Sequence, residues 1–363
     1  MVEVTKIGNK TLVMDGKILS LFRKGSLLRQ MYYGGYEDFD GANGGVWKKY
    51  INIPIKTVPL ENAIYVIEID DTNVSVYNAK GDLKAQASIA SEFWDLVRSD
   101  GNDIRVFDES FSQLYFSVRK WSYGNKATIF VRLPAGKTEL NIAFGNQKAI
   151  RSVYENPLEV YDIYDTFEDQ DISDWQEAGA SATWGVTSEK VKEGNYALKG
   201  DAGTTSGANR MFINNKAFSA KEFKVEVWVW DYWDGSTNNP NGVVIQAYPD
   251  TSGKSYVIEL THGDFAINKF TGTTSFTSLA SQSLGIEYDN WFKYEILYDN
   301  GEIIAKLYDN TESLLATLSA TDTEYQTGYV GVRVWRNVGY FDIFIAYKAT
   351  DPATFDTPRI LEF

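Results

Sequence analysis

The sequence predicts an all-β chain of two β-sandwich domains, with one short helix in the first domain. Short runs that are apolar, or that alternate between apolar and polar residues, recur along the chain and are separated by Gly, Asn and Asp, as in strands joined by turns. Aromatic residues, which suit the pleated surface of a sheet, make up 15% of the chain. A length of 363 residues is ample for two domains.

The composition excludes several classes of binding partner and several kinds of structure. A hydrophobic share of 44% and a charged share of 23% predict a packed globular core. The net charge is −14 and no cluster of Lys and Arg occurs, which argues against nucleic acid as a partner. No apolar run reaches about 18 residues, so we expect no membrane insertion. The absence of cysteine excludes disulfide bonds.

Residues 1–45 predict short strands that lead into a glycine-rich linker or an attachment segment. The first apolar residues alternate with polar ones, which is not the pattern of a signal peptide. We nevertheless expect an extracellular, cell-surface or virion-surface protein. Either a leader has been removed, or the protein leaves its cell by another route, for instance on a virus particle.

Residues 46–160 predict a β domain that contains the one helix. The runs WKKYINIPI, NAIYVIEID, TIFVRL and LNIAFG are strand candidates. In the segment QASIASEFWDLVRSDG the apolar residues instead recur at helical spacing, at Ile89, Phe93, Leu96 and Val97.

The pattern of residues 161–349 predicts a second sandwich. Residues 350–363 predict a C-terminal tail that docks back onto the folded chain. Seven or more short strands with closely spaced turns are typical of a sandwich or a jelly roll. Between two of these strands, the pair Asn300-Gly301 predicts a type I′ hairpin turn.

A series of motifs runs from residue 46 to about residue 150. It opens with VWKKYINIPI, continues with SDGNDIRVFDES at residues 99–110 and with LYFSVRKWSYG, and closes with ATIFVRLP and LNIAFGN. In this series the segment resembles the family catalogued as domain of unknown function 2341, with Val106 where Phe is usual and Ala143-Phe144 in place of Tyr-Tyr. The resemblance implies a β-rich accessory domain of surface proteins and names no chemistry.

A second set of motifs spans about residues 162–348. It comprises DTFEDQDISDW, NYALKG, a hairpin YEILYDNGEIIAKLYD that follows Trp291, and GYVGVRVWRNVGYFDIFIAYK. In these motifs the segment resembles a concanavalin A-like (laminin G-like) jelly roll. The resemblance implies the fold but not the function, because this fold hosts lectins, glucanases and adhesion modules alike.

The sequence lacks the carboxylate pattern of a glucanase. Such an enzyme on this fold needs paired carboxylates on one strand, in the pattern Glu-x-Asp-x-x-Glu. The nearest run is Glu68-Ile69-Asp70, where Asn73 replaces the second Glu, and it lies in the first domain. The single histidine, His262, has no partner for a zinc site or a catalytic triad. We therefore expect no catalytic residues.

The acidic run between Asp165 and Asp174 leaves two interpretations open. Calcium takes hard oxygen ligands. Jelly rolls of the kind resembled often carry a structural calcium that joins the first strand to the last, which implies Glu168, Asp169 and Asp342 as ligands. The alternative is a solvated acidic loop without a metal.

Alternation along three strands predicts an aromatic outer face. In FKVEVWVWDYW, GVVIQAYPD and YVGVRVW the β-branched residues fall on one side, which we expect to face the core. The other side then carries aromatic, amide and guanidinium groups, which suit the rings and hydroxyls of sugars. The alternative is that the other domain, a partner subunit or long loops cover this face. The candidate ligand-binding residues are Trp228, Trp230, Tyr232, Gln246, Tyr248, Arg333 and Trp335.

These observations favour non-catalytic binding or adhesion at a surface, with a glycan or surface glycoprotein as the ligand. A virion surface or receptor-binding protein is one form of this hypothesis. The first alternative is a structural subunit of a capsid, filament or surface layer, with aromatic faces buried between copies. The second alternative is a glycoside hydrolase with an unrecognised site.

Overall fold

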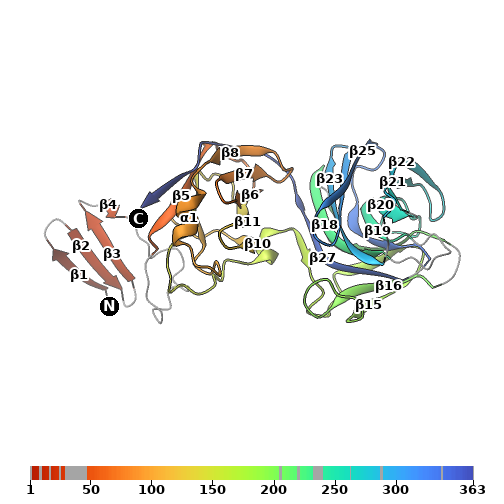
Figure 1. Cartoon of the computed structure of the whole chain (residues 1–363), viewed down its shortest axis with the longest axis horizontal. Coiled ribbons are helices and arrows are strands. Elements are labelled where there is room, and N and C mark those ends of the chain that lie inside the picture. Colours follow the sequence, from red (N-terminus) through yellow and green to blue (C-terminus); the bar gives the residue numbers. More distant parts are fainter. Residues whose placement is uncertain are drawn as a thin grey trace. The chain divides into compact units, whose positions relative to one another are not determined.

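Figure 1 shows a computed structural model of the chain, which describes residues 2–7, 10–15, 18–23, 26–28, 47–203, 207–218, 221–231, 240–261, 263–286, 289–336 and 338–362. The chain divides into two compact units. Unit 1 comprises Met1–Val160 together with Thr350–Phe363, and unit 2 comprises Tyr161–Ala349. Unit 2 is therefore inserted into the sequence of unit 1. The prediction of an all-β chain is confirmed, since strands dominate both units.

The N-terminal part of unit 1 forms a four-stranded antiparallel sheet in sequence order. Its strands are β1 (Val2–Ile7), β2 (Lys10–Asp15), β3 (Ile18–Arg23) and β4 (Ser26–Leu28). The glycine-rich stretch predicted as a linker or attachment segment lies outside the described residues.

Two further sheets pack around the main core of unit 1. One has the order β10-β11-β6-β7-β8, and the other has the order β28-β5-β12-β9 with β29 also paired to β5. The first set is β6 (Ala63–Ile69), β7 (Val74–Asn78), β8 (Leu83–Ala87), β10 (Phe116–Ser122) and β11 (Lys126–Leu133). The second set is β5 (Lys49–Thr57), β9 (Arg105–Asp108), β12 (Glu139–Phe144), β28 (Thr354–Phe355) and β29 (Arg359–Glu362).

Helix α1 (Ala90–Leu96) lies where the helical spacing predicts it. Its Phe93 and Trp94 are buried in the core between the two sheets, and the helix ends at Val97, whose backbone is extended. A single further turn of helix, α2 (Pro157–Val160), was not predicted, because four residues are too few to show a periodic pattern.

The C-terminal tail completes the second sheet of unit 1. Strands β28 and β29 both pair with β5, and Phe355 is buried in the unit 1 core. The backbone N–H of Ala353 donates a hydrogen bond of 3.0 Å to the Tyr65 hydroxyl, and the Phe355 ring meets the Tyr65 ring edge-on at 4.8 Å. The tail is thus part of the unit 1 core.

Unit 2 is a sandwich of two antiparallel sheets. The eight-stranded sheet has the order β15-β16-β27-β18-β23-β24-β25, with β13 also paired to β27. Its strands are β13 (Ile163–Asp165), β15 (Thr183–Thr187), β16 (Ala197–Asp201), β18 (Glu222–Asp231), β23 (Asn290–Asp299), β24 (Glu302–Tyr308), β25 (Leu314–Thr321) and β27 (Val338–Lys348).

The seven-stranded sheet of unit 2 has the order β14-β17-β26-β19-β20-β21-β22. Its strands are β14 (Trp175–Gly179), β17 (Arg210–Asn214), β19 (Gly242–Ala247), β20 (Ser255–Thr261), β21 (Asp264–Phe270), β22 (Phe276–Ser283) and β26 (Tyr329–Val334). The turn between β23 and β24 is formed by Asn300 and Gly301, both at positive φ, as a type I′ turn requires.

The inner faces of the two sheets form the core that the alternation predicts. The β-branched residues that the alternation assigns to the core are fully buried between the sheets, at Val225, Val227, Val229, Val243, Ile245, Val330, Val332 and Val334. The face assignment of these valines is therefore confirmed. In the described part of the chain, no helix is long and apolar enough to cross a membrane.

Candidate functional site

The predicted aromatic face does not exist as one surface. Strand β18, which carries Trp228 and Trp230, belongs to the eight-stranded sheet, whereas β26, which precedes Trp335, belongs to the seven-stranded sheet. Because both strands turn their valines toward the shared core, their other residues point to opposite outer faces. The prediction that these tryptophans share one sheet surface is wrong, because alternation fixes the face of a strand but not the sheet that it joins.

The segment before β16 covers Trp228 and Trp230. The ammonium of Lys192 lies 3.8 Å from the centre of the Trp228 ring, and that of Lys190 lies 4.1 Å from the Trp230 ring. Trp228 is only 5% exposed, and Trp230 packs edge-on against Trp291. These indoles are therefore occupied by cation–π contacts within the chain. The third predicted residue of this strand, Tyr232, lies outside the described residues.

A β-bulge turns Gln246 to the side opposite the one predicted. Its φ is +50°, and the register of β19 against β26 shifts between Val244 and Ala247. Ala247 consequently joins the outer apolar cluster, while Gln246 is fully buried beside the core residue Tyr298. One irregular residue is enough to invert the alternation beyond it.

Arg333 points outward as predicted but is completely buried. Its guanidinium forms an ion pair with Glu259 on β20 and lies 4.8 Å from the centre of the Trp335 ring and 5.0 Å from that of Phe270. Burial raises the pKa of Glu259 and lowers that of Arg333, and each charge opposes the shift of the other. Gly242 lies between the two residues in the sheet register, so no side chain separates them.

Loops close over this outer face of the seven-stranded sheet. The Asn209 backbone N–H donates to the Thr273 carbonyl at 2.6 Å, and its side-chain amide donates to the Gly253 carbonyl at 2.8 Å. The apolar residues on this face form a small buried cluster of their own: Ala178, Met211, Ile213, Val244, Ala247, Val257 and Phe270. The centre of the face is thus a second core, which matches the alternative that loops cover it.

An open pocket of about 280 Å³ lies at the end of the same sheet. Its walls include Tyr248, which follows β19, and Tyr329, the first residue of β26, and both side chains are half-buried. Small residues and one hydroxyl complete the lining: Ala217, Ala247, Pro249, Thr327 and Gly328. Of the six predicted ligand-binding residues that the structure describes, Tyr248 is the one that lines this pocket.

The core fixes the orientation of the Tyr248 ring. It meets the buried Tyr325 ring edge-on at a centre-to-centre distance of 5.5 Å, and Tyr325 donates its hydroxyl to the Phe270 carbonyl at 3.0 Å. Tyr329 was missed by the sequence reasoning. The alternation that places Arg333 and Trp335 outward also places Tyr329 outward, so extending the pattern to the start of the strand identifies it.

Two of the three predicted calcium ligands converge on one segment. Glu168 accepts the backbone N–H groups of Asn195 and Tyr196 at 2.8 Å, and Asp342 accepts those of Lys192 and Glu193 at 2.9 and 3.1 Å. Burial, with a smaller contribution from the charge of Glu168, raises the pKa of Asp342 to about 7.

The third predicted ligand is engaged elsewhere. Asp169 accepts the N–H of Asp171 within its own loop. Within the described residues, no three acidic or histidine side chains form a group that could hold a metal. Calcium takes six to eight oxygens, so two carboxylates alone do not complete a site.

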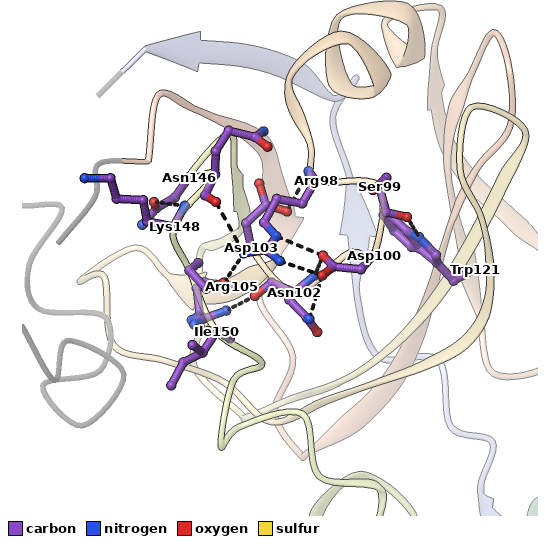
Figure 2. Close-up of polar contacts among 12 residues, drawn as sticks. Arg98, Ser99, Asp100, Asn102, Asp103, Arg105, Trp121, Asn146, Lys148 and Ile150 are labelled. Carbon is purple, nitrogen blue, oxygen red and sulfur yellow. Dashed lines mark hydrogen bonds and ion pairs between the residues drawn. The ribbon is translucent and has the colours of Figure 1, made fainter. Parts of the chain in front are cut away.

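The motif SDGNDIRVFDES of unit 1 forms a network of structural contacts (Figure 2). Arg98 makes two hydrogen bonds to the Asp100 carboxylate, at 2.9 and 2.6 Å. The buried Asp103 carboxylate accepts the backbone N–H groups of Arg98 and Gly145. Arg105 reaches the Ile150 carbonyl at 2.7 Å. The motif therefore fastens the loop after α1 to the segment after β12.

Comparison with known proteins gives one family match. A sequence model described as domain of unknown function DUF2341 matches residues 100–179. The match begins inside unit 1 and extends past the unit boundary at residue 160 into unit 2. No curated protein matches the sequence.

Solved structures similar to the chain include sugar-binding proteins at low identity. The carbohydrate binding module CBM66 of Bacillus subtilis is 14% identical with a TM-score of 0.38, over 48% of this chain and 96% of the module. Lectin I of Ulex europaeus, in complex with the methyl glycoside of α-L-fucose, is 10% identical with a TM-score of 0.33, over 48% and 99%. A Bacillus subtilis protein of unknown function with a galectin-like fold is 11% identical with a TM-score of 0.36, over 53% and 99%.

Proposed function

We propose that the protein is a non-catalytic glycan-binding protein that holds a sugar residue in the pocket between Tyr248 and Tyr329. The observation that carries this proposal is the pocket itself, whose lining combines two half-buried tyrosines with small residues. Its volume of about 280 Å³ lies just below the range of about 300–1,000 Å³ for drug-sized ligands, which suits a single sugar ring.

The chemistry of the lining fits a sugar. A pyranose presents C–H groups on its faces and hydroxyls on its rim, so it stacks on an aromatic ring while its rim forms hydrogen bonds. The tyrosines supply ring faces and phenolic hydroxyls, and Thr327 adds an exposed hydroxyl. Because Tyr325 supports the Tyr248 ring, that wall is largely ordered before a ligand arrives.

The same lining supports binding without hydrolysis. Glycoside hydrolysis requires two carboxyl groups on either side of the scissile bond. None of the residues that line the pocket carries a carboxylate. The buried Glu259 is paired with Arg333, and the buried Asp231 accepts the Tyr294 hydroxyl at 2.8 Å, so each of these carboxylates is engaged in the interior.

We further infer that binding takes place at a cell or virion surface, as adhesion to a glycan or glycoprotein. The competing function, a structural subunit with aromatic faces buried between copies, was suggested by the expected exposure of several tryptophans. Trp228 and Trp230 are instead covered by Lys192 and Lys190 of the same chain. They therefore supply no reason to expect a partner copy.

A glycan array followed by calorimetry on the best ligand tests the proposal. Tyr248→Ala and Tyr329→Ala should each weaken binding about tenfold, because an aromatic contact is worth about 0.5–1.5 kcal/mol beyond its buried area. The matched control is Tyr123→Ala, which removes a half-exposed tyrosine of unit 1. Unchanged affinity in both pocket variants, with folding verified by circular dichroism, would refute this site.

We also propose that a calcium ion binds beside Glu168 and Asp342. Both carboxylates hold residues 192–196, and that segment begins with Lys192, which covers Trp228. Backbone carbonyl oxygens or water must supply the remaining ligands. In that arrangement the ion is structural and does not contact the sugar.

A further inference from the structure

A lysine lies beside the tyrosine wall of the pocket. Tyr248 and Lys254 face each other across the turn between β19 and β20, where the Tyr248 backbone N–H donates to the Lys254 carbonyl at 3.0 Å. The ammonium of Lys254 lies 5.8 Å from the centre of the Tyr248 ring. The side chain is exposed to solvent, so a positive charge stands at the edge of the surface on which we place the sugar.

No carboxylate among the described residues lies within ion-pair distance of Lys254. Asp250 is an acidic neighbour in the same turn, and its carboxylate accepts the Ser252 N–H at 2.8 Å. Its pKa is lowered mainly by its hydrogen bonds from Ser252 and further by the charge of Lys254, so it stays ionised near the lysine.

Another cation in this part of the sandwich, Lys269, is already paired. Lys269 contacts the carboxylates of Asp322 at 2.6 Å and Glu324 at 2.9 Å. Lys254 is thus a cation beside the pocket that forms no salt bridge with any residue in the described ranges, in a chain whose net charge is −14.

We propose that the pocket selects an acidic sugar, with the ring between Tyr248 and Tyr329 and the carboxylate paired to Lys254. This inference rests on the proposed function and names its ligand class. A carboxylate forms a charge-assisted hydrogen bond with an ammonium, which is stronger than the bond a neutral hydroxyl makes. The net charge of −14 repels an acidic glycan at long range, so the selectivity depends on this local contact.

Removing either of two neighbouring charges should change the affinity for an acidic sugar, in opposite directions. Lys254→Gln removes the cation and keeps much of the side-chain length, so it should lower the affinity for an acidic sugar. Asp250→Asn removes the competing anion and keeps the hydrogen-bond acceptor for Ser252, so it should raise that affinity. Asp250→Asn should leave the affinity for a neutral sugar unchanged, and Lys254→Gln should change that affinity less than it changes the affinity for an acidic sugar. Lys348→Ala, at an exposed lysine at the end of β27, is the control for net charge.

The experiment compares matched probes on the full chain: methyl glucuronide with methyl glucoside, and methyl galacturonide with methyl galactoside, by ligand-observed NMR or calorimetry. We expect at least one acidic sugar to bind about tenfold more tightly than its neutral partner, since hydrogen bonds to charged groups are worth about 1.5–3 kcal/mol. Lys254→Gln should remove that preference, and Asp250→Asn should increase it by about twofold to fivefold.

The possible failures are distinguishable. Equal binding of acidic and neutral sugars, lost in Tyr329→Ala, overturns the acidic selectivity and leaves the proposed function standing. An equal loss in Lys254→Gln and Lys348→Ala shows a nonspecific charge effect and also overturns it. If no probe binds and no glycan on an array is retained, the proposed function fails together with this inference.

Discussion

Truncating Phe355 should destabilise unit 1 and leave unit 2 unchanged. The side chain is 6% exposed, contacts the Tyr65 ring, and lies in the core formed by residues more than two hundred positions earlier in the chain. Removal of a buried Phe costs about 3–5 kcal/mol, which for a unit of this size lowers the melting temperature by about 6–20 °C. Phe355→Ala should therefore shift the unfolding of unit 1 by that amount.

Hydrogen exchange resolved by peptide separates the two units in one experiment. In Phe355→Ala, amides of β5 should exchange faster in mild urea, while amides of β23 should keep their wild-type protection. The control is Thr354→Ala, which removes only the exposed hydrogen bond of 2.8 Å to Thr57 and should change stability by less than about 1 kcal/mol. If β5 is unaffected, or if β23 loses protection to the same degree, unit 1 does not depend on its tail as the structure indicates.

Four further predictions follow from the structure. Residues 161–349 expressed alone should fold, as judged by a cooperative melt, whereas a fragment ending at residue 160 should lack a stable core. A calcium chelator should lower the melting temperature of unit 2, because an ion bound only to the folded state stabilises it; an unchanged curve removes the ion from the proposal. Glu259→Leu should cost about 3–5 kcal/mol by leaving Arg333 unpaired, and Arg333→Met in the same chain should restore much of it in denaturant titrations. Burial raises the pKa of Asp165 to about 6, so the folded state binds the proton more tightly and unit 2 should lose stability as pH rises from 4 to 6; Asp165→Asn should flatten that slope.

The sequence was sufficient to predict which face of a strand points to the core, but not which sheet the strand joins. Period-2 alternation placed Val227 and Val332 in the core, and both are fully buried there. The same pattern carries no information on which sheet a strand joins, and β18 and β19 belong to opposite sheets although they are consecutive. Trp228 and Trp335 were therefore placed together without a physical basis.

The pocket that we propose as the binding site was only partly predictable, for a local reason. Tyr248 was named because alternation places it on the face opposite Val243 and Ile245. The bulge at Gln246 reverses the side on which later residues lie, so Tyr248 packs against the core cluster instead. A non-glycine residue at positive φ is hard to recognise from a single sequence. Tyr329 could have been found, because its strand stays regular from Tyr329 to Val334.

The insertion of unit 2 gives it two covalent connections to unit 1, and this has a mechanical consequence. The first and last strands of unit 2 lie side by side, with Ile163 opposite Ala346 in the β13–β27 pair. If unit 2 binds a glycan as we propose, a pulling force on that glycan is shared between two chain segments that leave unit 2 at the same place. A single proteolytic cut in one connection breaks the backbone but leaves unit 2 tethered by the other.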